Sequence, residues 1–159
     1  MSRLRVFADT NVLVDFLSRR EPFYRSARLL MLCAKVGEFE LFASSSQFTD
    51  LVYVLSDGGR RELLPAVLER LRELRTFVEV FAAGPAEVDR MLSAGWKDPE
   101  DSLVFECALS CKADVIATRD ADGFESSAIP ALGCEELFSW MAEERGIDYV
   151  ELDKSAFSD

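Results

Sequence analysis

Arg3-Leu4-Arg5-Val6-Phe7-Ala8-Asp9-Thr10-Asn11-Val12-Leu13-Val14-Asp15-Phe16-Leu17 is the stretch that decides the fold. Its apolar run, residues 6–8, stops at Asp9, and an apolar pattern with helical spacing resumes at Val12. This pattern is typical of a buried strand that turns into a helix, the first step of a parallel sheet. Ligands of open α/β sheets bind just beyond the carboxyl ends of the strands, which is where we expect Asp9.

The composition predicts one globular domain. The chain has 159 residues, of which 49% are hydrophobic, and these are spread along its whole length. No apolar run approaches the roughly 20 residues needed to cross a bilayer, so we expect no membrane association. The N-terminus lacks the long apolar core of a signal peptide, so we expect a cytoplasmic protein.

The missing histidines narrow the chemistry. A chain without histidine cannot use Ser-His-Asp or Cys-His catalysis or His-ligated metals. Its four cysteines form no Cys-x-x-Cys pair, so we expect small buried thiols rather than a zinc site. The 29 acidic residues point first to hard cations bound through oxygen.

The charge is unevenly distributed. The net charge is −11, but residues 1–75 carry 12 basic and 10 acidic side chains, whereas residues 76–159 carry 6 and 19. This balance argues against general coating of nucleic acids. It remains compatible with a nuclease in which a few arginines contact the substrate and bound metal neutralises the acidic side chains.

Alternating apolar patterns predict strands and helices in turn. After the opening strand, strands are predicted at residues 39–43, 77–81, 115–117 and, weakly, 129–132. Helices are predicted at residues 12–18, 23–36, 47–55, 63–74, 85–94, 101–111 and 135–144. The expected fold is a three-layer α/β/α sandwich with a central parallel β-sheet of four to five strands. We assign residues 1–145 to this domain and 146–159 to a tail or edge strand.

Acidic side chains recur where predicted strands end or neighbouring helices begin. Like charges brought together raise each other's pKa, and folded proteins accept this mostly when a cation neutralises them. Mg²⁺ held by a few carboxylates can activate a water and stabilise a phosphoryl transition state. The acids at these places are Asp9, Asp50, Asp98, Asp101, Asp120 and Asp122.

Each acid also has an ordinary structural explanation. Asp9 and the acids before the fourth strand could cap helices, and those after that strand could form a turn beside Gly123. Asp50 could be a solvated helix residue. The joint placement therefore carries the metal hypothesis, rather than any single acid. Three further acids are assigned no part in it: Asp15, Asp57 and Asp114.

Three segments resemble the PIN domain, a family of metal-dependent ribonucleases that includes the VapC-type toxins of bacterial toxin–antitoxin pairs. They are residues 9–15 (DTNVLVD), 98–108 (DPEDSLVFECA) and 113–120 (ADVIATRD). The resemblance covers residues 3–138, and the last two segments are the more specific. It implies hydrolysis of RNA with one or two Mg²⁺ or Mn²⁺ ions, a small antitoxin as partner and a homodimer.

The resemblance also assigns roles to the acids. Asp9, Asp101 and Asp120 match metal-binding positions, and the further ligand candidates are Asp98 and Asp122. These roles are expectations that depend on the family pattern.

Three other positions are assigned by the same pattern. Asp50 falls where the family usually has a glutamate, and because aspartate is one methylene shorter, we expect contact through a bridging water. Asn11 and Thr118 match polar positions that orient the acids.

Substrate phosphates need positive charge, for which the candidates are Arg19, Arg20, Arg25, Arg28, Arg60 and Arg61.

Two other functions remain open at this point. A phosphatase of the haloacid dehalogenase type also begins with an acid after its first strand, but it uses a second aspartate where this chain has Asn11. A non-catalytic module of the PIN fold that binds RNA or protein, with a weakened metal site, is made credible by Asp50.

Overall fold

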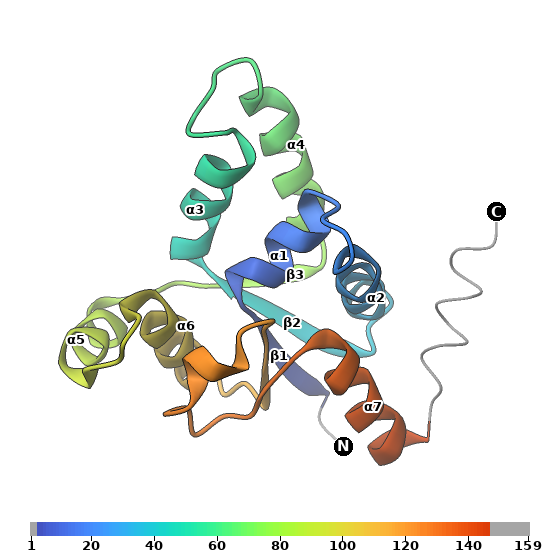
Figure 1. The fold of residues 1–159 in the computed structure, drawn as a ribbon, viewed down its shortest axis with the longest axis vertical. Helices are drawn as coiled ribbons and strands as arrows, with labels where there is room; N and C mark the ends of the chain where they lie inside the picture. The colour runs from blue at the N-terminus through green and yellow to red at the C-terminus, as the bar shows by residue number, and fades with distance from the viewer. Residues whose placement is uncertain (1–2, 147–159) are drawn as a thin grey trace.

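Five parallel strands form the centre of residues 3–146, the part of the chain that the computed structural model describes (Figure 1). The strands are β1 Leu4–Ala8, β2 Phe39–Ser44, β3 Val78–Phe81, β4 Val115–Ala117 and β5 Ala131–Leu132. The helices are α1 Thr10–Leu17, α2 Tyr24–Lys35, α3 Ser45–Leu55, α4 Leu64–Arg75, α5 Pro85–Ala94, α6 Pro99–Ser110, the 3-10 helix η1 Ala121–Phe124 and α7 Cys134–Arg145.

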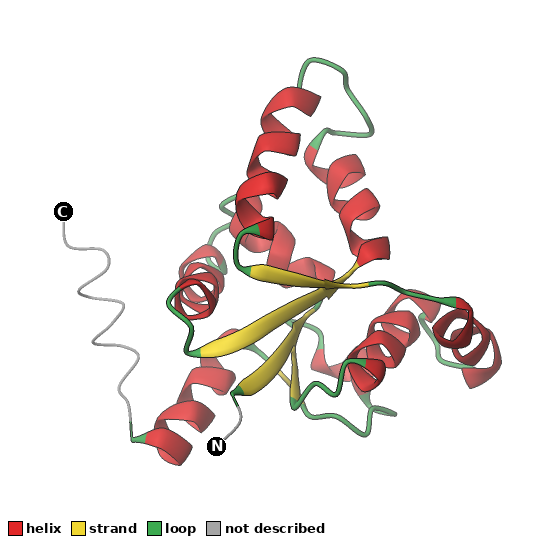
Figure 2. Cartoon of the chain, turned by 180° about the vertical axis from the view of Figure 1, so that it is seen from behind, coloured by secondary structure: helices red, strands yellow, loops and turns green. Residues whose placement is uncertain are grey.

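The sheet has the order β3-β2-β1-β4-β5, with helices on both faces (Figure 2). The predicted α/β/α sandwich is therefore confirmed. The chain adds β2 and β3 on one side of β1 and then adds β4 and β5 on the other side, so the direction of strand order switches between β1 and β4. Such a switch point leaves a crevice at the carboxyl ends of the two strands, the usual place for a ligand.

Strand β1 separates two apolar cores. Val6 and Ala8 pack into the larger core with α1, α2 and α7, whereas Phe7 packs with α6 on the opposite face. This alternation follows from the two-residue period of a strand. All three side chains are fully buried, which explains why the central strands read as continuous apolar runs.

The structure changes some predicted boundaries. Helix α6 begins at Pro99, two residues before the predicted start, because proline suits the first helical position and Asp98 caps the helix. The predicted loop after β4 contains η1, and β5 has only two residues. The tail or edge strand expected at residues 146–159 lies, apart from Gly146, outside the described residues. None of the helices in residues 3–146 is long and apolar enough to cross a membrane.

Candidate metal centre

Asp9 and Thr118 lie side by side at the switch point. The register pairs Ala8 with Ala117, so the residue that follows each strand reaches the same edge of the sheet. The backbone N–H of Asp9 donates to Ala117 O at 2.9 Å, which continues the ladder by one residue. The fold itself therefore fixes the position of Asp9.

The Asp9 carboxylate is buried but hydrogen-bonded. Only 4% of Asp9 is exposed. Thr118 Oγ1 donates to Oδ2 at 2.8 Å, and the Thr10 N–H donates to Oδ1 at 2.8 Å, which also caps α1. Burial raises the pKa of Asp9, with a smaller contribution from the nearby charges of Asp120 and Asp98, although these two hydrogen bonds oppose the increase.

The Thr118 hydroxyl connects Asp9 to the loop that carries Asp120. It accepts from the Asp120 N–H at 3.0 Å and from Asn11 Nδ2 at 3.4 Å. Asn11 Oδ1 in turn accepts from the Arg119 N–H at 3.3 Å. Asn11 and Thr118 thus lie in one hydrogen-bond network with Asp9 and Asp120, and their role in orienting the acids stays a prediction.

Asp101 lies half-buried in the first turn of α6. Burial, followed by repulsion from neighbouring carboxylates, raises its pKa to about 7. A carboxyl group with this pKa is largely protonated in mildly acidic solution, and it would release its proton to the solvent on binding a cation. The neighbouring carboxylates are Asp9, Asp98, Asp120 and Glu100.

Gly123 borders the space that Asp101 and Asp120 share. A Cβ atom on Gly123 would lie 2.5 Å from Asp101 Oδ2 and 3.0 Å from Asp120 Oδ2, so no other residue fits without displacing a carboxylate. The absence of a side chain at Gly123 therefore lets an Asp101 oxygen and an Asp120 oxygen approach the same backbone position and each other. The oxygen donors and their mutual repulsion fit a hard divalent ion.

The acids do not form a finished coordination sphere. Within residues 3–146, no three acidic or cysteine side chains already converge at metal-binding distances. Asp98 lies exposed as the cap of α6, and Asp122 lies exposed in η1. A cation bound beside Gly123 would therefore have to draw further carboxylates inward.

Asp50 lies exposed in α3, and its charge acts on Glu100, which neighbours Asp101 in α6. Burial raises the pKa of Glu100, followed by repulsion from Asp50 and Asp9. A hydrogen bond with Thr10 opposes this increase. Glu100 was missed by the sequence analysis, and its place beside Asp101 in the first turn of α6 was the available signal.

Gln47 is a second residue that the sequence analysis did not assign to the centre. Its buried Nε2 donates to Ala8 O at 2.9 Å and to Thr10 Oγ1 at 3.1 Å, while its Oε1 accepts from the Ser44 N–H at 2.7 Å. It thereby ties the ends of β1 and β2 to the start of α3. The Ser-x-x-Gln spacing of a capping box was the sequence signal.

The predicted RNA-binding arginines lie away from these acids. Asp9 caps the first turn of α1, whereas Arg19 and Arg20 lie just beyond its other end. The helix between them is about 12 Å long. Arg60 and Arg61 lie between α3 and α4, beyond the end of α3 that is farther from the sheet (Figure 1). Arg60 forms ion pairs there with Asp57 and Glu62. Their RNA-binding role stays a prediction.

The sequence profile of the PIN domain matches residues 5–122. The chain belongs to the PIN domain family. A curated relative, ribonuclease VapC1 of Aquifex aeolicus (strain VF5), is 28% identical over 142 residues, covering 86% of this chain and 95% of that protein. The resemblance inferred from the three sequence segments is thus confirmed.

Solved structures show the same fold. DNA-bound VapBC from Salmonella typhimurium matches with a TM-score of 0.61 at 16% identity, covering 82% of this chain and 98% of that one. VapC20 from Mycobacterium tuberculosis, described as a sarcin-ricin loop cleaving toxin, matches with a TM-score of 0.58 at 12% identity. That match covers 76% of this chain and 94% of the other.

Removing the Asp101 charge should change how stability depends on pH. The folded-state pKa of Asp101 is raised to about 7. As pH rises from about 4 to about 7, the unfolded chain loses this proton before the folded protein does, so the metal-free protein becomes less stable, and the loss levels off above about pH 7. Thermal melts of the metal-free wild type and Asp101→Asn should show a wild-type melting temperature that falls relative to the variant across this window. Parallel pH profiles would contradict the assignment.

Adding a methyl group at position 123 should weaken cation binding. We expect Gly123→Ala to lower Mn²⁺ affinity at least about 10-fold in calorimetric titration, because its Cβ would displace the Asp101 and Asp120 oxygens. Gly133→Ala is the matched control, because a Cβ there would meet only ordinary contacts, the nearest at 3.8 Å. Equal Mn²⁺ affinities for the two variants would show that the space beside Gly123 binds no cation.

Proposed function

We propose that this protein hydrolyses RNA phosphodiester bonds with one or two Mg²⁺ or Mn²⁺ ions held by Asp9, Asp101 and Asp120. The observation that carries the proposal is the meeting of the Asp101 and Asp120 carboxylates beside Gly123, where an oxygen of each lies within 3.0 Å of the position that a Cβ would take. The ribonuclease name of the VapC1 relative supports RNA as substrate. The raised pKa of Asp101 supports a role in binding a cation.

Different residues of the chain would have different roles in the centre. A divalent cation, when bound, would supply an activated water and shield charge on the phosphate. Thr10 and Thr118 hold the Asp9 carboxylate in one orientation. Asp101 would release its proton to the solvent on binding the cation, and the absence of a side chain at Gly123 leaves room for its carboxylate.

Other acids surround this core. Asp50 would act through a bridging water, since it is exposed and influences Glu100. Asp98 and Asp122 lie at the exposed edge, where they would complete the coordination sphere directly or through water. Asn11 would orient the centre through Thr118.

The wider setting follows the relatives. Solved neighbours include the DNA-bound VapBC complex and FitAcB from Neisseria gonorrhoeae, which supports a small antitoxin as the partner of this chain. We also propose a homodimer, a cytoplasmic location and RNA contacts by the exposed residues Arg19, Arg20, Arg60 and Arg61. The antitoxin would keep the ribonuclease inactive until it is released.

A non-catalytic module that binds RNA or protein is the second candidate. It is favoured by the exposed Asp50 and by the lack of a ready-made set of three carboxylates within residues 3–146. Such a module would bind RNA without cleaving it and would bind Mn²⁺ only above the millimolar range. Comparing RNA binding with RNA cleavage separates the two candidates.

The catalytic proposal predicts the loss of activity when the acids are neutralised. Purified Asp9→Asn/Asp101→Asn should cleave RNA at least about 100-fold more slowly than wild type with Mn²⁺, because two metal ligands lose their charge. Asp57→Asn, an exposed acid at the far end of α3, controls for a general change in charge. Metal-dependent cleavage that persists in the double variant would refute this mechanism.

A further inference from the structure

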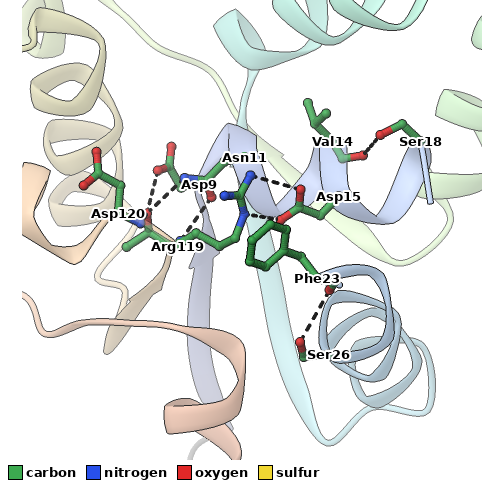
Figure 3. Close-up of polar contacts among 10 residues, drawn as sticks. Asp9, Asn11, Val14, Asp15, Ser18, Phe23, Ser26, Arg119 and Asp120 are labelled. Atoms are coloured by element: carbon green, nitrogen blue, oxygen red, sulfur yellow. Dashed lines mark hydrogen bonds and ion pairs between the residues drawn. The ribbon is translucent and has the colours of Figure 1, made fainter. Parts of the chain in front are cut away.

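Asp15 and Arg119 form a bidentate ion pair beside the candidate centre (Figure 3). Arg119 Nε donates to Asp15 Oδ2 at 2.5 Å, and Nη2 donates to Oδ1 at 3.1 Å. Only 1% of Asp15 is exposed, and a carboxylate buried to this extent without a partner would be costly. The sequence analysis assigned Asp15 no part in the site, whereas the structure makes it the buried anchor of Arg119.

Phe23 completes the contact. The Arg119 guanidinium lies 4.0 Å from the centre of the Phe23 ring, in the geometry of a cation–π interaction. Phe23 immediately precedes α2, and Asp15 lies on α1. One side chain from the loop after β4 is thus held by two other segments of the chain.

Helix α1 holds residue 119 at a second point. Asn11 Oδ1 accepts from the Arg119 backbone N–H at 3.3 Å. Asn11 and Asp15 are four residues apart, so they lie on the same face of α1. One helix face therefore fixes both the backbone and the side chain of Arg119.

Arg119 lies between two residues of the candidate centre. Thr118 hydrogen-bonds Asp9, and Asp120 borders the space beside Gly123. Residues 119–122 are exposed, so packing alone holds this part of the loop weakly. Whatever fixes Arg119 also fixes the direction in which Asp120 leaves the sheet.

We infer that Asp15, Arg119 and Phe23 form a clasp that positions Asp120 for cation binding, with Arg119 as the positioning residue. This inference rests on the proposed function. The alternative, direct contact between Arg119 and a substrate phosphate, is disfavoured because the Arg119 charge is already paired with a buried carboxylate. Supporting residues of this kind typically change metal affinity by about 10–100-fold.

The chain offers a matched control pair. Arg90 Nε donates to Glu106 Oε2 at 2.7 Å, and the Glu106 side chain is only 8% exposed. Arg90 contacts Glu87, Glu106 and Ser110, which lie on α5 and α6 rather than in the loop after β4. Arg90→Ala therefore reports the cost of losing an arginine from a buried acid without disturbing Asp120.

The test combines hydrogen exchange of the metal-free protein with Mn²⁺ calorimetry. Arg119→Ala should make residues 118–124 exchange at least about 10-fold faster and weaken Mn²⁺ binding about 10-fold or more, while Arg119→Lys should recover part of both effects. Arg90→Ala should leave both readouts at wild-type values even if its melting temperature falls. Asp15→Asn/Arg119→Gln removes both charges together and should reproduce the two defects if Arg119→Ala does not fold.

Two results would overturn the clasp. One is wild-type exchange and wild-type Mn²⁺ affinity in a folded variant that lacks the Arg119 charge. The other is a variant whose only defect is a higher KM for RNA, which would make Arg119 a phosphate contact. Failure of the proposed function would be seen separately, as a wild-type protein that cleaves no RNA. Hydrogen exchange at residues 118–124 would still test the clasp in that case, because it requires no RNA cleavage.

Discussion

The burial of one carboxylate, Asp9, is the constraint on which the rest of the centre depends. A parallel strand with both faces covered carries this acid to the edge of the sheet and then turns into a helix, which leaves 4% of Asp9 exposed. Taking a carboxylate out of water is costly unless hydrogen bonds or a cation compensate. Thr10 and Thr118 provide part of that compensation, and the neighbouring acids act against it.

The fold thus gathers more negative charge than it neutralises. Asp101 responds by holding its proton up to about pH 7, and Glu100 is shifted in the same direction. Elsewhere in residues 3–146 buried acids are paired with arginines, as in Asp15–Arg119 and Glu106–Arg90. The difference between acids paired with arginines and acids gathered without them at the switch point is what favours this edge as the candidate site.

The sequence predicted what local patterns determine. The run that ends at Asp9, the alternation of strands and helices and the three segments typical of the PIN domain were sufficient for the fold and its family. Contacts between distant residues could not be predicted in this way. Asp15 and Arg119 are 104 positions apart, and the spacing of Asp15 on α1 gives no sign of its partner. The contribution of Gly123 is equally invisible, because it depends on where two other chain segments bring their oxygens.

Calorimetric titration of the metal-free protein with Mn²⁺, in buffers of different ionisation enthalpy, tests the central claim most directly. If the acids at the switch point bind a cation, Mn²⁺ should bind below about 1 mM and release nearly one proton at about pH 6, where Asp101 is still protonated. At about pH 8.5 the release should be close to zero. Absence of binding below millimolar Mn²⁺, or proton release that does not change with pH, would contradict the account.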